Sequence, residues 1–377
     1  MESPQYNSDF IKMGLLLIET ENYEAALSHY DMAIDSNPII ANFGKGLVYS
    51  HLGDHTTALS CFETSLENNQ FLPALIEKGR TLRKTGNPQF ALESFNRALE
   101  IDKENSYMML EKADLLIEMK DYDESLILLE GIIKLKPRFF KAMHRKGDVL
   151  CIQKKYREAC EQYIKSLELK PQYAPSWIGL GIAFQGLYQY DDAIDCYKSA
   201  INIDSSNNLA NLLLGDLYHS QKDYGNALKY YRIALKNDEN CLEAYYGKGM
   251  VLTSLGDKKK GLKYLEKACA KNSYLKYAFW ARGNLLKDEN KIKESLFSFK
   301  QAIALDPYYL PAWESMEELY SISGKLDKAI HCHDQMLNTF STSEAIKKQN
   351  TEIKPDYKEL YLKSIDFSKS FEYNKRV

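Results

Sequence analysis

The chain has 377 residues, of which 45% are hydrophobic and 27% charged, enough apolar material for a folded core and too much for a wholly disordered chain. Its 52 acidic and 49 basic residues leave a net charge of −3, so the overall charge favours neither nucleic acid nor an anionic membrane surface. Because proline (10) and glycine (19) are scarce and tyrosine (27) is abundant, the composition predicts an all-α fold packed through aromatic side chains.

The seven cysteines stand singly and form no Cys-x-x-Cys pair, so the sequence predicts neither a disulfide framework nor a zinc ribbon. The apolar run at residues 11–18 contains Lys12 and is far shorter than the roughly 20 residues that a membrane span needs. No basic segment with a small-residue cleavage site comes before it. We therefore expect a reduced, cytoplasmic location and no membrane contact.

A small residue recurs along the chain at a nearly constant interval, with the first two intervals slightly shorter than the later ones, which are all equal. The series is Gly14, Gly46, Gly79, Ala113, Gly147, Gly181, Gly215, Gly249 and Gly283. Each is followed by a second small residue, a bulky one and a third modest one, as Gly181 is followed by Ala193, Tyr197 and Ala200. Apolar residues spaced by three, four and seven predict two short helices per unit, which the small residues allow to pack closely. The expected units begin near residues 7, 39, 72, 106, 140, 174, 208, 242, 276 and 310.

This pattern, with its period of about 34 residues, resembles the tetratricopeptide repeat (TPR) over residues 7–339, with residues 1–6 as an N-terminal lead. The sixth unit matches best, with Trp177, Gly181, Phe184, Ala193 and Tyr197 in the family's positions. The resemblance implies an all-α fold, a right-handed α-solenoid of helix-turn-helix units, and a non-catalytic scaffold or adaptor for other proteins.

Residues 340–377 depart from the repeat. Tyr357, Leu360, Tyr361 and Ile365 predict one amphipathic helix that caps the last unit, followed by a tail with a slight basic character. The tail could enter the binding face of its own chain or of a second copy, so self-assembly or autoinhibition through residues 356–377 is the alternative function.

Several groups of polar residues raise the possibility of other chemistry. His144, Asp148 and Cys151 share one helical face, but nothing in the sequence supplies an oxyanion site, and we expect no catalytic residue. His331 and His333 flank Cys332 and point in different directions on a helix, so we expect no metal site, and no cofactor is predicted. A small basic cluster of the third unit, formed by Arg80, Arg83 and Lys84, precedes acidic residues at matching positions of the fourth, which indicates charge pairing between repeats or plain solvation. The acidic residues are Glu111, Asp114 and Glu118.

The TPR resemblance implies that the first helices line a concave groove, and their residues are the candidate binding site for a peptide segment of a partner protein. The candidates are Ile178, Ile182, Leu209, Leu212, Leu213, Asp216, Tyr246, Met250, Tyr277, Trp280 and Asn284. The competing interpretation is that neighbouring helices partly bury them. The carboxylate clamp of chaperone-binding TPR domains is not expected, because only Lys141 and Arg145 match it.

Overall fold

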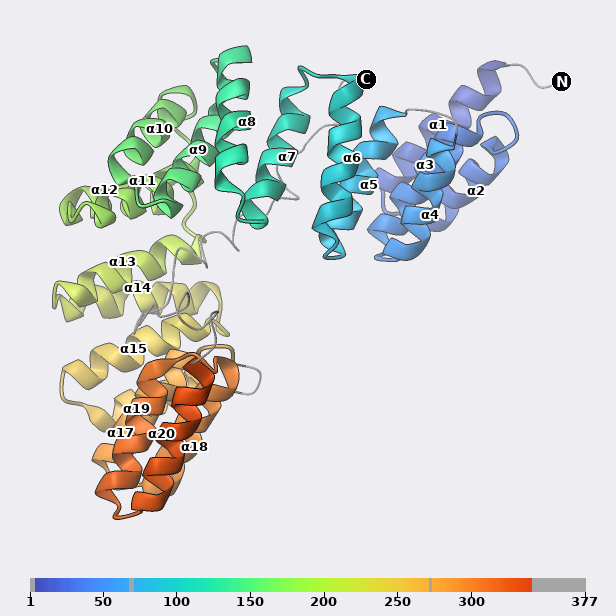
Figure 1. Ribbon diagram of the computed structural model, residues 1–377. Helices are drawn as coiled ribbons and strands as arrows, with labels where there is room; N and C mark the ends of the chain where they lie inside the picture. The colour runs from blue at the N-terminus through green and yellow to red at the C-terminus, as the bar shows by residue number, and fades with distance from the viewer. Residues whose placement is uncertain (1–3, 68–70, 271–272, 341–377) are drawn as a thin grey trace. The chain divides into compact units, whose positions relative to one another are not determined.

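The computed structural model describes residues 4–67, 71–270 and 273–340, and every regular element in these ranges is an α-helix (Figure 1). The odd-numbered helices, the first of each pair, are α1 (Pro4–Glu19), α3 (Pro38–His51), α5 (Leu72–Lys84), α7 (Ser106–Glu118), α9 (Phe140–Ile152), α11 (Ala174–Gly186), α13 (Asn208–Ser220), α15 (Leu242–Ser254), α17 (Lys276–Asp288) and α19 (Leu310–Ile322). The second helices are α2 (Tyr23–Ala33), α4 (His55–Leu66), α6 (Pro88–Ile101), α8 (Tyr122–Leu135), α10 (Tyr156–Leu169), α12 (Tyr190–Ile203), α14 (Tyr224–Asn237), α16 (Lys258–Ala268), α18 (Ile292–Leu305) and α20 (Leu326–Phe340). The all-α repeat fold is therefore confirmed.

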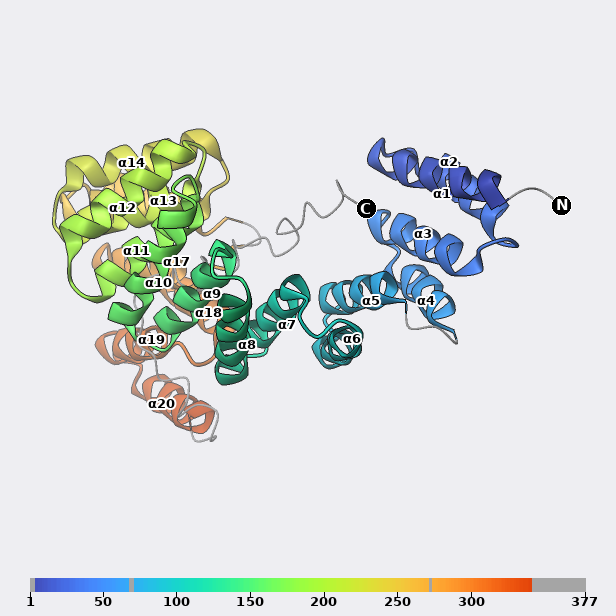
Figure 2. The same cartoon turned by 90° about the horizontal axis from the view of Figure 1, so that it is seen from above.

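The chain divides into two compact units between Pro171 and Gln172, which we call unit 1 (α1–α10) and unit 2 (α11–α20). No change in the repeat pattern of the sequence marks this division. In each unit a first helix packs mainly on the second helix of its own pair, as α1 lies beside α2 in Figure 2. None of the helices in the described ranges is long and apolar enough to cross a membrane.

Each pair is joined by a turn whose central residue has a left-handed backbone. Four of the ten turns place glycine there, as Gly256 does with φ of 86°, but six place other residues, such as Lys222 with φ of 63°. The amide that follows the left-handed residue then closes the first helix, as Asp223 N–H donates to Tyr218 O at 2.9 Å. The same bond recurs at nearly every pair, so the first helices end in the same way along the chain.

The core lies between the two helices of each pair. Tyr197 of α12 is completely buried, and its ring packs directly on Gly181 of α11. A Cβ atom at Gly181 would lie 2.5 Å from that ring, and the same pairing joins Gly147 to Tyr163 and Gly283 to Phe299. The small residue is thus required by the aromatic ring 16 positions later, which explains the periodicity of the sequence.

The last pair differs from the others on the outer face of α20. Leu326, Ile330 and Leu337 of α20 are exposed, whereas Leu262, which occupies the place of Ile330 in α16, is buried against α17. No described helix follows α20. The predicted capping helix and the tail at residues 340–377 lie outside the residues whose side chains are described.

Candidate functional site

The first helices of unit 2 carry two rows of side chains, to which each repeat contributes one residue. The inner row is Ile178, Leu212, Tyr246 and Trp280, and the open row is Ile182, Asp216, Met250 and Asn284. The two rows are four positions apart on α11, α13, α15 and α17, so they lie side by side on one face of the helices.

Most of the inner row is buried between neighbouring repeats. Ile178, Leu212 and Tyr246 are at most 5% exposed, and the ring of Tyr246 meets that of Tyr277 edge to face at 4.7 Å between centroids. Trp280 is half-buried, and its Nε1–H donates to Pro311 O and to the Ser315 hydroxyl, both at 3.0 Å. These side chains join one repeat to the next.

The structure therefore divides the candidate residues of the sequence into two groups. Five are buried, as the competing interpretation expects, and six are half-buried. The buried group is Ile178, Leu212, Leu213, Tyr246 and Tyr277, and the half-buried group is Ile182, Leu209, Asp216, Met250, Trp280 and Asn284. The repeat pattern by itself did not separate the two groups, although its apolar and mixed positions are offset by four residues.

Polar side chains of unit 2 are fixed beside the open row by bonds to the second helices. The hydroxyl of Tyr231 donates to Asp216, and that of Tyr197 donates to Gln185 Oε1 at 3.0 Å. Burial, with the Asp216 carboxylate adding to it, raises the pKa of Tyr231 well above its ordinary value, so the phenol keeps its proton and donates. The Asp216 carboxylate is thereby held in one orientation on the half-exposed face.

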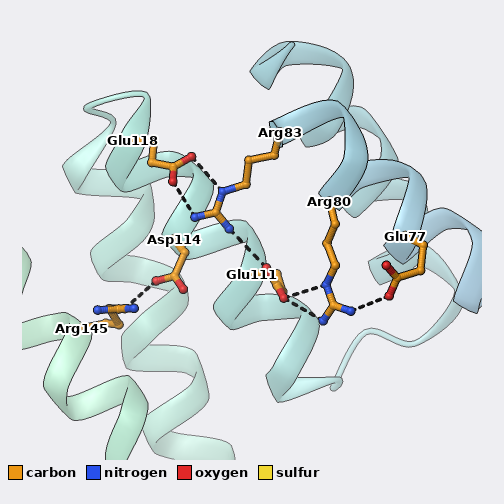
Figure 3. A network of polar contacts seen from close by, with 7 residues as sticks. All are labelled: Glu77, Arg80, Arg83, Glu111, Asp114, Glu118 and Arg145. Carbon is orange, nitrogen blue, oxygen red and sulfur yellow. Dashed lines mark hydrogen bonds and ion pairs between the residues drawn. The ribbon is translucent and has the colours of Figure 1, made fainter. Parts of the chain in front are cut away.

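In unit 1 the corresponding face of the first helices carries ion pairs that join one first helix to the next (Figure 3). Arg80 Nη2 lies 2.8 Å from Glu111 Oε1, and Arg83 Nη2 lies 2.6 Å from Glu118 Oε1. In both cases an arginine of α5 reaches a carboxylate of α7, 31 or 35 residues later. Charge pairing between repeats is therefore confirmed for Arg80 and Arg83, whereas Lys84 is exposed and has no ion pair in the described part of the chain.

The chain of ion pairs continues from α7 to α9. Arg145 Nε lies 2.9 Å from Asp114 Oδ1 and Nη1 lies 3.1 Å from Asp148 Oδ2, while the Tyr163 hydroxyl donates to Asp148 at 2.7 Å. Arg145 is only 5% exposed. Arg145, one of the two residues that match the carboxylate clamp, is therefore paired with internal carboxylates.

The histidine and cysteine groups that the sequence raised for catalysis or metal binding do not form an open site. His144, Asp148 and Cys151 are all buried, and burial lowers the pKa of His144 to about 4 although Asp148 opposes the shift. Cys332 is buried while His331 and His333 are exposed, so the three do not converge. Across the described part of the chain, no group of three or more His, Cys, Asp or Glu side chains could hold a metal ion.

Comparison with protein families gives matches along most of both units. Two families described as "Tetratricopeptide repeat" match the chain, one at residues 11–73, 76–138 and 223–275 and the other at residues 140–173 and 277–309, and a third described as "TPR repeat" matches residues 189–222. The chain belongs to the tetratricopeptide repeat family. Each TPR consists of one first helix and the second helix that follows it.

Solved structures share this TPR fold at low sequence identity. Yeast Tom70 is 14% identical with a TM-score of 0.53, and the match covers 96% of each chain. A chain of the APC/C hetero-tetramer Cut9-Hcn1 is 15% identical with a TM-score of 0.51, covering 91% of this chain and 83% of that one. These similarities establish the fold alone.

One curated relative is similar in sequence over a shorter stretch. Anaphase-promoting complex subunit 3 of Schizosaccharomyces pombe is 28% identical over 141 residues, which are 33% of this chain and 21% of the relative. The chain thus spans about a fifth of the length of the relative that it matches. The TPR fold as such supports a protein-interaction scaffold.

Proposed function

We propose that the protein is a non-catalytic scaffold that holds a peptide segment of a partner protein along the open row of unit 2. The observation that carries the proposal is the row itself: Ile182, Asp216, Met250 and Asn284 recur once per repeat, alternate between apolar and polar, and are all half-buried. Half-exposed apolar side chains next to fixed polar groups are the usual composition of a peptide site. Trp280 and Leu209 extend the apolar surface beside the row.

The spacing of the open row predicts how far apart the apolar side chains of a bound peptide would be. Neighbouring packed helices lie roughly 10 Å apart, and an extended peptide advances about 3.3 Å per residue. Apolar side chains that contact Ile182 and Met250 would therefore be about six residues apart. A residue midway between them would face the Asp216 carboxylate, which favours a donor or a positive charge there.

The test is selection from a peptide library on three forms of the full chain. The wild type and the control Ile127→Glu/Phe297→Glu, which changes exposed apolar residues of the second helices α8 and α18, should enrich the same spaced apolar motif. The variant Ile182→Glu/Met250→Glu should lose it, with circular dichroism showing that its helices persist. Enrichment of the same motif on the variant, or of none on the wild type, would contradict the proposal.

A chain that ends at residue 355 tests the alternative use of the tail. Stronger peptide enrichment after truncation would mean that residues 356–377 occupy the row of their own chain. A fall in mass measured by light scattering would instead mean that they join copies of the protein.

A further inference from the structure

Two consecutive second helices of unit 2 carry a concentration of positive charge that the other second helices lack. α14 has three basic residues and no acidic one, and α16 has five lysines and only Glu266 as an acidic residue. All eight basic side chains are exposed. They are Lys229, Arg232, Lys236, Lys258, Lys259, Lys260, Lys263 and Lys267, which together we call the basic face. It stands out because the whole chain has a net charge of −3.

The basic face is ordered in rows. Lys259, Lys263 and Lys267 are spaced by four residues and form one line along α16, and the three basic residues of α14 follow a similar spacing. Like charges four apart on a helix destabilise it by a few tenths of a kcal/mol per pair. The row on α16 therefore lowers the stability of the helix, which favours a role in binding.

Few of these charges are neutralised within the protein. Lys258 and Lys260 form ion pairs with Asp288 and Asp257, both at 2.7 Å. In the described part of the chain, Lys259 and Lys263 have no ion pair. The same holds for Arg232 and Lys236 of α14.

Two tyrosines link the basic face to α15, which packs against both helices. Tyr245 and Tyr264 stack at 6.2 Å between centroids, with Lys248 Nζ 4.2 Å from the ring centre of Tyr264 and Lys267 Nζ 5.0 Å from that of Tyr245. A hydrogen bond from Lys248, followed by the charges of the surrounding lysines, lowers the pKa of the Tyr264 phenol. The rings are thus occupied by each other and by lysines, and offer no free platform on which a nucleic-acid base could stack.

The length of the basic face, the acidic residues near it and its lysine content limit the kind of partner that could bind. A helix of 14 residues such as α14 is about 21 Å long. The preceding second helix, α12, exposes Asp191, Asp192 and Asp195, which would repel a long polyanion running past the basic face. Seven of the eight basic residues are lysines, which lack the planar fork with which arginine grips phosphate. A short acidic polypeptide meets all three conditions.

We infer that the basic face of α14 and α16 is a docking surface for a short acidic segment of a partner protein, separate from the open row on the first helices. About seven extended residues span its length. The contacts are between solvent-exposed charges, so the basic face mainly sets the rate and selectivity with which the partner associates. The affinity should depend strongly on salt.

Fluorescence anisotropy with a labelled 12-residue peptide of alternating Glu and Ser tests this inference. A Gln-Ser peptide serves as the neutral probe and a 12-nucleotide single-stranded RNA as the phosphate probe. The wild type should bind the acidic peptide, at least tenfold more weakly at 200 mM than at 50 mM salt, and the other two probes less well. Ile182→Ser/Met250→Ser, which leaves the net charge unchanged, should bind it as the wild type does, which separates this surface from the proposed peptide site.

The decisive comparison uses two triple variants of equal charge. Lys259→Glu/Lys263→Glu/Lys267→Glu should weaken binding at least tenfold, whereas Lys165→Glu/Lys293→Glu/Lys300→Glu, at exposed positions of α10 and α18, should change it less than twofold. Equal losses in both variants would mean that only the overall charge acts, and would overturn the inference. Tighter binding of the RNA, or no binding of the acidic peptide by the wild type, would overturn it as well.

Discussion

Arg145 of α9 and Asp114 of α7 form an ion pair at 2.9 Å in which both side chains are almost completely buried. Two successive repeats of unit 1 therefore share a charge pair in their interior, and Asp148 shares the same arginine. Removing one partner of such a pair leaves a buried charge uncompensated, which costs far more than the pair itself contributes.

Arg145→Met should lower the free energy of unfolding of unit 1 by about 3–5 kcal/mol. The neighbouring Lys146→Met is the control, because its ammonium bonds Glu130 at 2.8 Å on the surface and should contribute less than about 1 kcal/mol. Urea unfolding followed by circular dichroism measures both variants. Similar losses in the two would show that the burial of Arg145 does not matter.

His144 should make stability depend on pH. Its pKa in the folded protein is about 4 against an ordinary 6.5, so the unfolded chain binds the proton first as the pH falls. The contribution of His144 to the free energy of unfolding is fully present above pH 6.5 and is lost as the pH falls toward 4. The loss between pH 7 and 4.5 is on the order of 2 kcal/mol. Asp114, whose pKa burial raises to about 6, gives the opposite slope over pH 4–6.

The contribution of His144 is therefore measured as a difference. The wild type should lose more stability than His144→Asn between pH 7 and 4.5, while the exposed His51→Asn should behave as the wild type does. Parallel pH profiles for the wild type and His144→Asn would contradict the assignment.

Gly181→Ala should destabilise unit 2 by about 1–3 kcal/mol, since its Cβ would lie 2.5 Å from the ring of the fully buried Tyr197. Gly225→Ala is the matched change at a helical glycine with space, where a Cβ would lie 3.7 Å from Asp223 Oδ1. There the substitution should stabilise by up to about 1 kcal/mol, because alanine is the better helix former. Thermal unfolding distinguishes the opposite signs.

The turns of adjacent repeats permit a reciprocal test. Lys222 and Gly256 hold the same left-handed position, with φ of 63° and 86°. Lys222→Gly should stabilise and Gly256→Ala should destabilise, each by about 1 kcal/mol, because only glycine adopts this backbone without steric cost. Two changes of the same sign in the unfolding midpoint would show that the turn geometry does not control stability.

The repeat fold was predictable from the sequence because it follows from pairs of residues in a fixed local spacing, such as Gly181 with Tyr197. The exposure of the candidate site was not, since it depends on how closely successive first helices approach. Ile178 and Ile182 are both apolar and four residues apart, yet only the first is buried. The charge pairs could be predicted from the sequence because arginines and carboxylates occupy complementary positions in consecutive repeats. The basic face could also have been found in the sequence by comparing the charge of α14 and α16 with that of the other second helices.

The order of charges in Figure 3 has a consequence for how the repeats can be rearranged. From α5 to α7 an arginine, Arg80, meets Glu111, but from α7 to α9 the carboxylate of Asp114 meets Arg145. Deletion of residues 106–139, one full repeat, would keep the remaining helices and their packing in phase, yet it would bring Arg80 opposite Arg145. Repeats that are interchangeable in shape are thus not interchangeable in sequence order, and the fourth repeat acts as an adapter between two neighbours that would repel each other.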